Sequence, residues 1–250
     1  MGDARSTKGR ARMNMAEAFD RGARRYDLMV RLNPGYHREL RRAAEALTSR
    51  LDGEPQALLD LACGSGASTQ ALAEAAPEGS YILGLDASPG MLERARAKRW
   101  PPQVRFERAT IGELNLDRWA CGTFDGALAC YLFRNVPEEQ RDGAVAEVFE
   151  LLRPGAWLCV QEYSVDGNNA SRRVWDAVSR GVIIPLGSVI DGNPTLYRYL
   201  WRSVIDFDSV ATFADRLSAA GFVDVAHRTA AGWQRGVLHT FIARKPEETP

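Results

Sequence analysis

Net charge, paired cysteines and long apolar runs are what this 250-residue chain has least of. Basic and acidic residues both number 32, so the formal charge is zero. Because proteins that bind the phosphate backbone of nucleic acids are usually basic, nucleic acid is disfavoured as a partner. The few cysteines form no Cys-x-x-Cys pair, and they are Cys63, Cys121, Cys130 and Cys159. We therefore expect reduced thiols, with neither disulfides nor a metal site.

No segment is predicted to cross a membrane. The longest apolar run, residues 182–190, is broken by Pro185 and Gly187 and is too short to span a bilayer. The first residues lack the apolar core of a secretory signal, and residues 1–14 are expected to form a disordered tail. We expect one domain over residues 1–250, cytoplasmic, with at most peripheral membrane contact. A homodimer is left open.

A glycine turn between two apolar runs is the most informative feature present. Residues 58–61 lead into Gly64-Ser65-Gly66, and residues 81–85 end in Asp86. A strand, a glycine turn opening a helix, and a second strand ending in a carboxylate place backbone beside a flat cofactor and a carboxylate beside its ribose. A dinucleotide loop would carry glycine or alanine where Thr69 stands. Asp60 would repel a pyrophosphate and attract the ammonium of S-adenosylmethionine (SAM), so we predict a SAM-dependent methyltransferase.

The predicted cofactor contacts all fall at or just after strand ends. Asp86 is expected to accept two hydrogen bonds from the ribose diol, and Asp60 to face the methionine ammonium. Thr69 is predicted to bind the carboxylate end of SAM near a helix N-terminus. The full predicted set is Asp60, Ala62, Gly64, Gly66, Thr69, Asp86, Ala87, Met91, Thr110, Ile111 and Cys130. The alternatives are a glycine turn in another α/β sheet and an NAD(P) oxidoreductase.

Alternating strand and helix signals predict a doubly wound, mostly parallel sheet. The strands are predicted at residues 57–61, 81–85, 104–108, 126–130 and 156–162, followed by an antiparallel pair at 223–228 and 237–243. Ser88 followed by Pro89 marks a helix start, and Asp208 is predicted to cap a late helix closed by Gly221. Two N-terminal helices are expected before the first strand, the second repeating apolar residues from Leu40 to Leu51.

Residues 168–205 break this rhythm with an apolar and aromatic segment. Trp175, Tyr197 and Trp201 are among its members, and glycine and proline interrupt it. We interpret it as a helical lid over a hydrophobic substrate. The alternative is a helical pair that packs on the sheet.

The chain resembles the ubiquinone/menaquinone biosynthesis C-methyltransferase family over roughly residues 16–245. The matching segments are Phe19-Asp20, Tyr26-Asp27-Leu28-Met29, Phe133-Arg134-Asn135-Val136, Leu151-Leu152-Arg153-Pro154-Gly155 and Gln161-Glu162-Tyr163. The resemblance implies a class I methyltransferase (Rossmann-like) fold with seven strands, the last antiparallel. It also implies methyl transfer from SAM to a ring carbon of a quinol or phenol such as demethylmenaquinol.

Departures from the family pattern keep other acceptors open. His37 sits one residue early, and Thr110-Ile111 stand where an Asp or Asn is expected for the adenine, which the Ile111 N–H can bind instead. The alternatives are O- or C-methylation of another small aromatic, polyketide or terpenoid metabolite. A SAM-binding fold without methyl transfer is a further alternative.

Methylation of a ring carbon requires the neighbouring hydroxyl to lose its proton, so a base or an anion stabiliser is expected. Arg134 and Asn135 are predicted to hold the quinol oxygens; the alternative is an internal salt bridge and a turn cap. Tyr26 is expected to close over SAM or the substrate, although core packing suits its spacing almost as well. The candidate bases are Glu162, His37 and, more weakly, His239.

Overall fold

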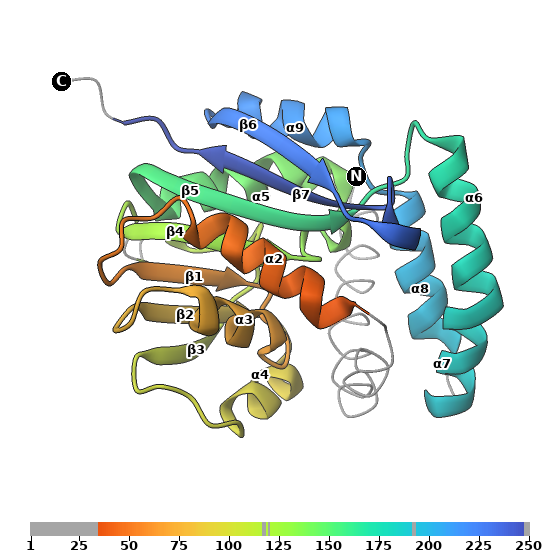
Figure 1. Ribbon diagram of the computed structural model, residues 1–250, viewed down its shortest axis with the longest axis horizontal. Coiled ribbons are helices and arrows are strands. Elements are labelled where there is room, and N and C mark those ends of the chain that lie inside the picture. Colours follow the sequence, from red (N-terminus) through yellow and green to blue (C-terminus); the bar gives the residue numbers. More distant parts are fainter. Residues whose placement is uncertain (1–34, 117–118, 120, 192–193, 248–250) are drawn as a thin grey trace, which may run out of the picture.

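A computed structural model describes residues 35–116, 119, 121–191 and 194–247 (Figure 1). The predicted tail 1–14, the first N-terminal helix and Tyr26 lie outside these residues. The second predicted helix is α2 (Tyr36–Thr48), which begins after Gly35 in the left-handed region and buries Leu40 and Leu47.

Seven strands form one sheet in the order β3-β2-β1-β4-β5-β7-β6. The bounds are β1 (Ala57–Leu61), β2 (Tyr81–Asp86), β3 (Val104–Arg108), β4 (Phe124–Cys130), β5 (Leu152–Tyr163), β6 (Val223–Thr229) and β7 (Leu238–Arg244). The first five are parallel, and β7 runs antiparallel between β5 and β6. The class I methyltransferase fold, with its last strand antiparallel, is confirmed.

Successive side chains point to opposite sides of the sheet, and the central strands β1, β4 and β5 are largely buried on both sides, whereas the edge strand β6 is mostly exposed. Leu58 and Leu128 pack in one cluster with α2, α3 (Ala67–Ala75) and α4 (Pro89–Arg96). Leu59 and Leu158 pack in the other with α5 (Glu138–Leu151) and α9 (Val210–Ala219). The helices thus cover both faces and leave the strand ends for a site.

The predicted insertion is helical. It comprises α6 (Asn169–Val178), the π turn η3 (Ser179–Ile183), α7 (Ile184–Asp191) and α8 (Pro194–Ile205). These helices lie beyond the carboxyl ends of the parallel strands and not on a sheet face (Figure 1). This placement is the one that a lid requires.

Two local predictions were wrong. The side chain that caps α9 is Ser209, whose Oγ accepts a hydrogen bond from Thr212 N, whereas Asp208 binds arginines. β5 begins at Leu152 and not at residue 156, because the expected Pro154-Gly155 turn is absorbed into the strand. A register shift between Phe124 and Gly126 and a left-handed Gly155 accommodate the extra residues, as in a bulge.

Candidate active site

The turn after β1 is held in an unusual backbone conformation. Ala62 has φ of 58°, a left-handed value that costs free energy for a residue with a side chain. Gly64 and Gly66 also have positive φ, at 54° and 87°, and Gly66 is the N-cap of α3. Cys63 N donates to Leu85 O at 2.9 Å, which ties the turn to β2. The strain lies where a cofactor would approach the backbone.

The two glycines of this turn are required for different reasons. A Cβ at Gly66 would lie 2.8 Å from the ring of Trp100, so the protein itself fills that side. A Cβ at Gly64 would meet no protein atom within 4 Å. The open space beside Gly64 leaves room for a flat ligand against the backbone.

Asp86 is positioned by two backbone amides. Its Oδ2 accepts a hydrogen bond from Gly64 N and its Oδ1 one from Ser88 N, each at 2.8 Å. The second bond belongs to the start of α4, where Ser88 caps Met91 N as predicted. The carboxylate is half-buried, and a carboxylate oxygen can accept more than one hydrogen bond. This fits a ribose diol.

Asp60 is fully buried at the end of β1. Its Oδ2 accepts hydrogen bonds from the hydroxyls of Ser68 at 2.8 Å and Thr69 at 2.5 Å. Its Oδ1 has no hydrogen-bond partner among the described residues. Burial raises the pKa of Asp60 to about 7, and the two hydroxyls lower it. An unpartnered, buried carboxylate oxygen fits a cationic group such as the ammonium of SAM.

The predicted role of Thr69 needs correction. Its side chain is buried and its hydroxyl donates to Asp60. It therefore positions the Asp60 carboxylate and is not directed at a cofactor carboxylate. Sequence reasoning placed it at the correct turn but could not assign its partner.

The other predicted cofactor residues gather at the same edge of the sheet. Ala87 follows β2 and is half-buried, and Met91 is buried in the first turn of α4. Thr110 and Ile111 follow β3, with Ile111 buried. Cys130 ends β4, and burial raises the pKa of its thiol, which keeps it protonated at neutral pH. Since parallel strands end together, one site collects these residues from four strands.

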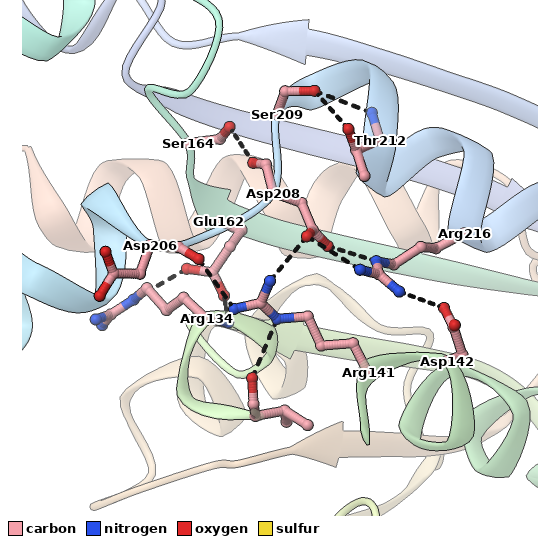
Figure 2. A network of polar contacts seen from close by, with 11 residues as sticks. Arg134, Arg141, Asp142, Glu162, Ser164, Asp206, Asp208, Ser209, Thr212 and Arg216 are labelled. Carbon is pink, nitrogen blue, oxygen red and sulfur yellow. Dashed lines mark hydrogen bonds and ion pairs between the residues drawn. The ribbon is translucent and has the colours of Figure 1, made fainter. Parts of the chain in front are cut away.

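The predicted catalytic residues Arg134 and Glu162 bind each other. Arg134 lies in the short 3-10 turn η2 (Phe133–Asn135) after β4, and Glu162 is near the end of β5. Arg134 Nε lies 3.0 Å from Glu162 Oε1, and both side chains are almost fully buried (Figure 2). Burial raises the pKa of Glu162 to about 7, while Arg134 lowers it. These contacts form the internal ion pair that was the alternative interpretation of Arg134.

The turn that carries Arg134 also holds the insertion. Arg134 Nη1 donates to the Ser203 hydroxyl of α8 at 2.7 Å. Asn135 Nδ2 donates to Tyr131 O at 2.7 Å, and its Oδ1 accepts from the Tyr199 hydroxyl of α8 at 3.2 Å. Asn135 is thus a turn cap that joins η2 to α8. Direct contact of either residue with a substrate stays a prediction.

The two candidate histidines differ in position. His37 is exposed in the first turn of α2, with its ring edge-on to Tyr36 at 5.5 Å. His239 is buried on β7, opposite Glu162 in the strand register. Burial lowers the pKa of His239, so its imidazole is neutral at neutral pH. Of the two, only His239 lies beside the buried ion pair.

A stack of aromatic rings at the strand ends was missed as a unit. Tyr131 stacks between Tyr36 and Tyr163, with centroid distances of 5.6 and 5.2 Å, and Tyr163 stacks on Trp175 at 5.1 Å. Tyr131 has φ of 62°, which turns the chain sharply after β4. The rings join α2, the sheet and α6. The available signal was an aromatic residue at the carboxyl end of each of two strands, Tyr131 directly after β4 and Tyr163 as the last residue of β5.

No group of metal-ligating side chains suited to a metal ion occurs in the described part of the chain. Within the same residues, no helix is long and apolar enough to cross a membrane. All four cysteines are free, and three of them are buried.

Comparison with known proteins gives one consistent family. The model of the ubiE/COQ5 methyltransferase family matches residues 5–245. The "Ubiquinone/menaquinone biosynthesis C-methyltransferase UbiE" of Methylobacterium nodulans is 33% identical over 86% of this chain and 85% of its own length. The "Demethylmenaquinone methyltransferase" of Thermus thermophilus is 34% identical over 82% of this chain and 90% of its own.

Solved structures share the fold at lower identity. A SAM-dependent methyltransferase from Thermotoga maritima, described as a possible histamine N-methyltransferase, superposes with a TM-score of 0.61 at 17% identity, over 92% of this chain and 99% of its own. The [4+2]-cyclase SpnF superposes with a TM-score of 0.67 at 16% identity, over 93% and 95%. These likenesses establish the fold and do not distinguish between reactions.

Proposed function

Because the chain belongs to the ubiE/COQ5 methyltransferase family and is a SAM-dependent methyltransferase, we propose that it methylates a ring carbon of a prenylated hydroquinone such as demethylmenaquinol. The observation that carries this proposal is the near-full-length match to relatives named for quinone C-methylation. The sheet edge described above supplies a fitting place for the reaction.

On the cofactor side, each polar group has a defined task. Asp86 would accept the ribose hydroxyls, and Gly64 would let the cofactor approach the backbone. Asp60 Oδ1 would face the ammonium, with Ser68 and Thr69 holding the carboxylate in place. When bound, SAM supplies a methyl group already activated on a sulfonium. The protein therefore contributes chiefly in-line positioning and exclusion of water.

On the substrate side, a group must accept the proton of the quinol hydroxyl. Glu162 is our choice, acting through a water molecule, because a carboxylate whose pKa is about 7 can take a proton near neutral pH. Arg134 would hold Glu162 in place and stabilise the negative charge that forms on the quinol oxygen. His37 is too exposed to share this environment.

The insertion α6–α8 is proposed to be a lid over the hydrophobic acceptor. Its attachment through Arg134, Asn135 and the aromatic stack supports this role, because these residues join it to the strand ends. We further propose that the protein works in the cytoplasm, where its four free cysteines would stay reduced.

The direct test is methyl transfer from methyl-labelled SAM to chemically reduced demethylmenaquinol, followed by mass spectrometry and NMR of the product. We expect the label on a ring carbon. Asp86→Ala is the inactive control, and Asp125→Ala, at the opposite end of the strands, is the active one. Label on oxygen would replace C-methylation with O-methylation, and absence of transfer despite SAM binding would overturn the quinol proposal.

The pKa of Asp60 makes SAM binding pH-dependent. A nearby ammonium stabilises the charged carboxylate, so binding lowers a pKa that is about 7 in the free protein and releases a proton. We expect SAM affinity to fall as the pH drops from 7 to 5.5, by up to about tenfold per pH unit. The ammonium of SAM itself stays largely charged in this range, as an α-amino group titrates near pH 8.

Isothermal titration calorimetry in two buffers of different ionisation enthalpy measures the released proton. Asp60→Asn cannot titrate and is the matched control, so its proton release is expected to vanish. Equal proton release by Asp60→Asn and the wild type would show that another group is responsible.

A further inference from the structure

The outer face of the α6–α7 helix is apolar although it faces solvent. α6, η3 and α7 form one continuous helical run from Asn169 to Asp191. Of the seven large hydrophobic side chains exposed in the described residues, four lie on this run: Val174, Val182, Leu186 and Val189. Val189 is 83% exposed. The other three, Tyr81, Val223 and Trp233, are scattered over separate elements.

The π turn keeps these side chains in line. In an α-helix, a residue four positions further along the chain lies about 40° further around the helix axis. A π turn contains more residues per turn, and it therefore offsets this rotation. Val174, Val178, Val182 and Leu186 follow this spacing across η3, and Val189 continues it in α7. The result is one apolar stripe, defined by Val174, Val182, Leu186 and Val189.

The inward face of the same run is attached to the candidate site. Trp175 is buried and stacks on Tyr163 at the end of β5. Its indole N–H donates to Trp201 O of α8 at 3.2 Å. The run therefore has one side attached to the site, and the exposed apolar stripe lies on an adjacent side, about 100° around the helix axis.

The charge of the insertion identifies what the stripe would meet. Residues 169–205 contain five arginines, two aspartates and neither lysine nor glutamate, a formal charge of +3, whereas the rest of the chain carries −3. Arg172, Arg173, Arg180 and Arg198 are exposed, and the Arg180 guanidinium lies 4.8 Å from the ring centre of Trp201. The positive charge of Arg202 is compensated by an ion pair with Asp206.

We propose that this face docks on an anionic lipid bilayer. An amphipathic helix with an apolar stripe and flanking arginines binds at the lipid headgroups, the apolar residues entering the acyl boundary. Pairing with a second copy of the same face is disfavoured because two like-charged surfaces would meet. The proposal rests on the proposed function in one respect: docking here would place the site beside a membrane that holds a prenylated acceptor.

Vesicle co-sedimentation of the full chain tests the docking. We expect binding to vesicles of equal parts phosphatidylcholine and phosphatidylglycerol, weaker binding to phosphatidylcholine alone, and weakening by salt. The triple variant Val182→Ser/Leu186→Ser/Val189→Ser is expected to bind at least about tenfold more weakly, because three apolar side chains no longer enter the acyl boundary. The matched control is Tyr81→Ser/Val223→Ser/Trp233→Ser, which removes three exposed large hydrophobic side chains elsewhere.

Each remaining outcome has a defined meaning. Equal vesicle binding by the triple variant and the wild type would overturn the proposal. Absence of wild-type binding to anionic vesicles would overturn it as well. Loss of a dimer in the triple variant, by light scattering, assigns the stripe to a contact between copies instead. Methylation of a quinol without a prenyl tail, assayed without vesicles, tests the proposed function separately. Circular dichroism checks that each variant is folded.

Discussion

Replacing Asp86 with alanine is expected to weaken SAM binding at least about a hundredfold while the sheet stays folded. Two hydrogen bonds from a ribose diol to a carboxylate contribute about 1.5–3 kcal/mol each, and both are lost together. The variant also frees Gly64 N and Ser88 N, which loosens the turn that faces the cofactor. Titration calorimetry with SAM measures the change directly.

Asp125→Ala is the control for this loss. Asp125 Oδ2 accepts a hydrogen bond from Ala57 N, so its removal also frees a backbone amide of β1, but at the opposite end of the strand. SAM affinity is expected to be unchanged in this variant. Asp86→Asn keeps one acceptor oxygen, and its SAM affinity is expected to lie between those of Asp86→Ala and Asp125→Ala. Full SAM affinity in Asp86→Ala would contradict the assignment of Asp86 to the ribose.

The strands, the helix start and the strand-end carboxylates of this site could be predicted because each depends on only a few neighbouring residues. The bounds of β1 and β3 matched, and the Ser88-Pro89 helix start was correct, since caps and apolar runs act over a few residues. Asp60 and Asp86 were predicted for the same reason: Asp86 is the last residue of β2, and Asp60 is the last but one of β1. Parallel strands end on one edge, so the gathering of the cofactor residues followed from strand order.

The partners of these residues were not predictable because they are distant in sequence. Arg134 meets Glu162 and Ser203 from separate elements, and nothing in the spacing of the three residues indicates the contact. Asp208 satisfies the preference for a helix cap, yet it binds Arg141 and Arg216 (Figure 2), leaving Ser209 as the cap. A pattern identifies the face on which a side chain lies, and tertiary packing selects its partner.

The Arg134–Glu162 pair is expected to show the largest stability effects in the molecule. Glu162→Leu leaves a buried guanidinium without its counter-charge and is expected to lower the free energy of unfolding by about 3–5 kcal/mol. The double variant Arg134→Leu/Glu162→Leu removes both charges and is expected to recover most of this loss. Urea unfolding of the wild type, both single variants and the double variant gives the coupling energy.

The same four proteins separate a structural role from a catalytic one. If Glu162 accepts the quinol proton and Arg134 stabilises the anion, the double variant should fold and bind SAM but turn over at least about a hundredfold more slowly. Arg141→Leu is the matched control, because it breaks a second buried ion pair, Arg141–Asp208 at 2.8 Å, that contains neither proposed catalytic side chain. It should lose stability and keep its turnover per folded molecule. Wild-type turnover in the refolded double variant would restrict Arg134 and Glu162 to holding α8 against the sheet, and would move the search for the base to His239.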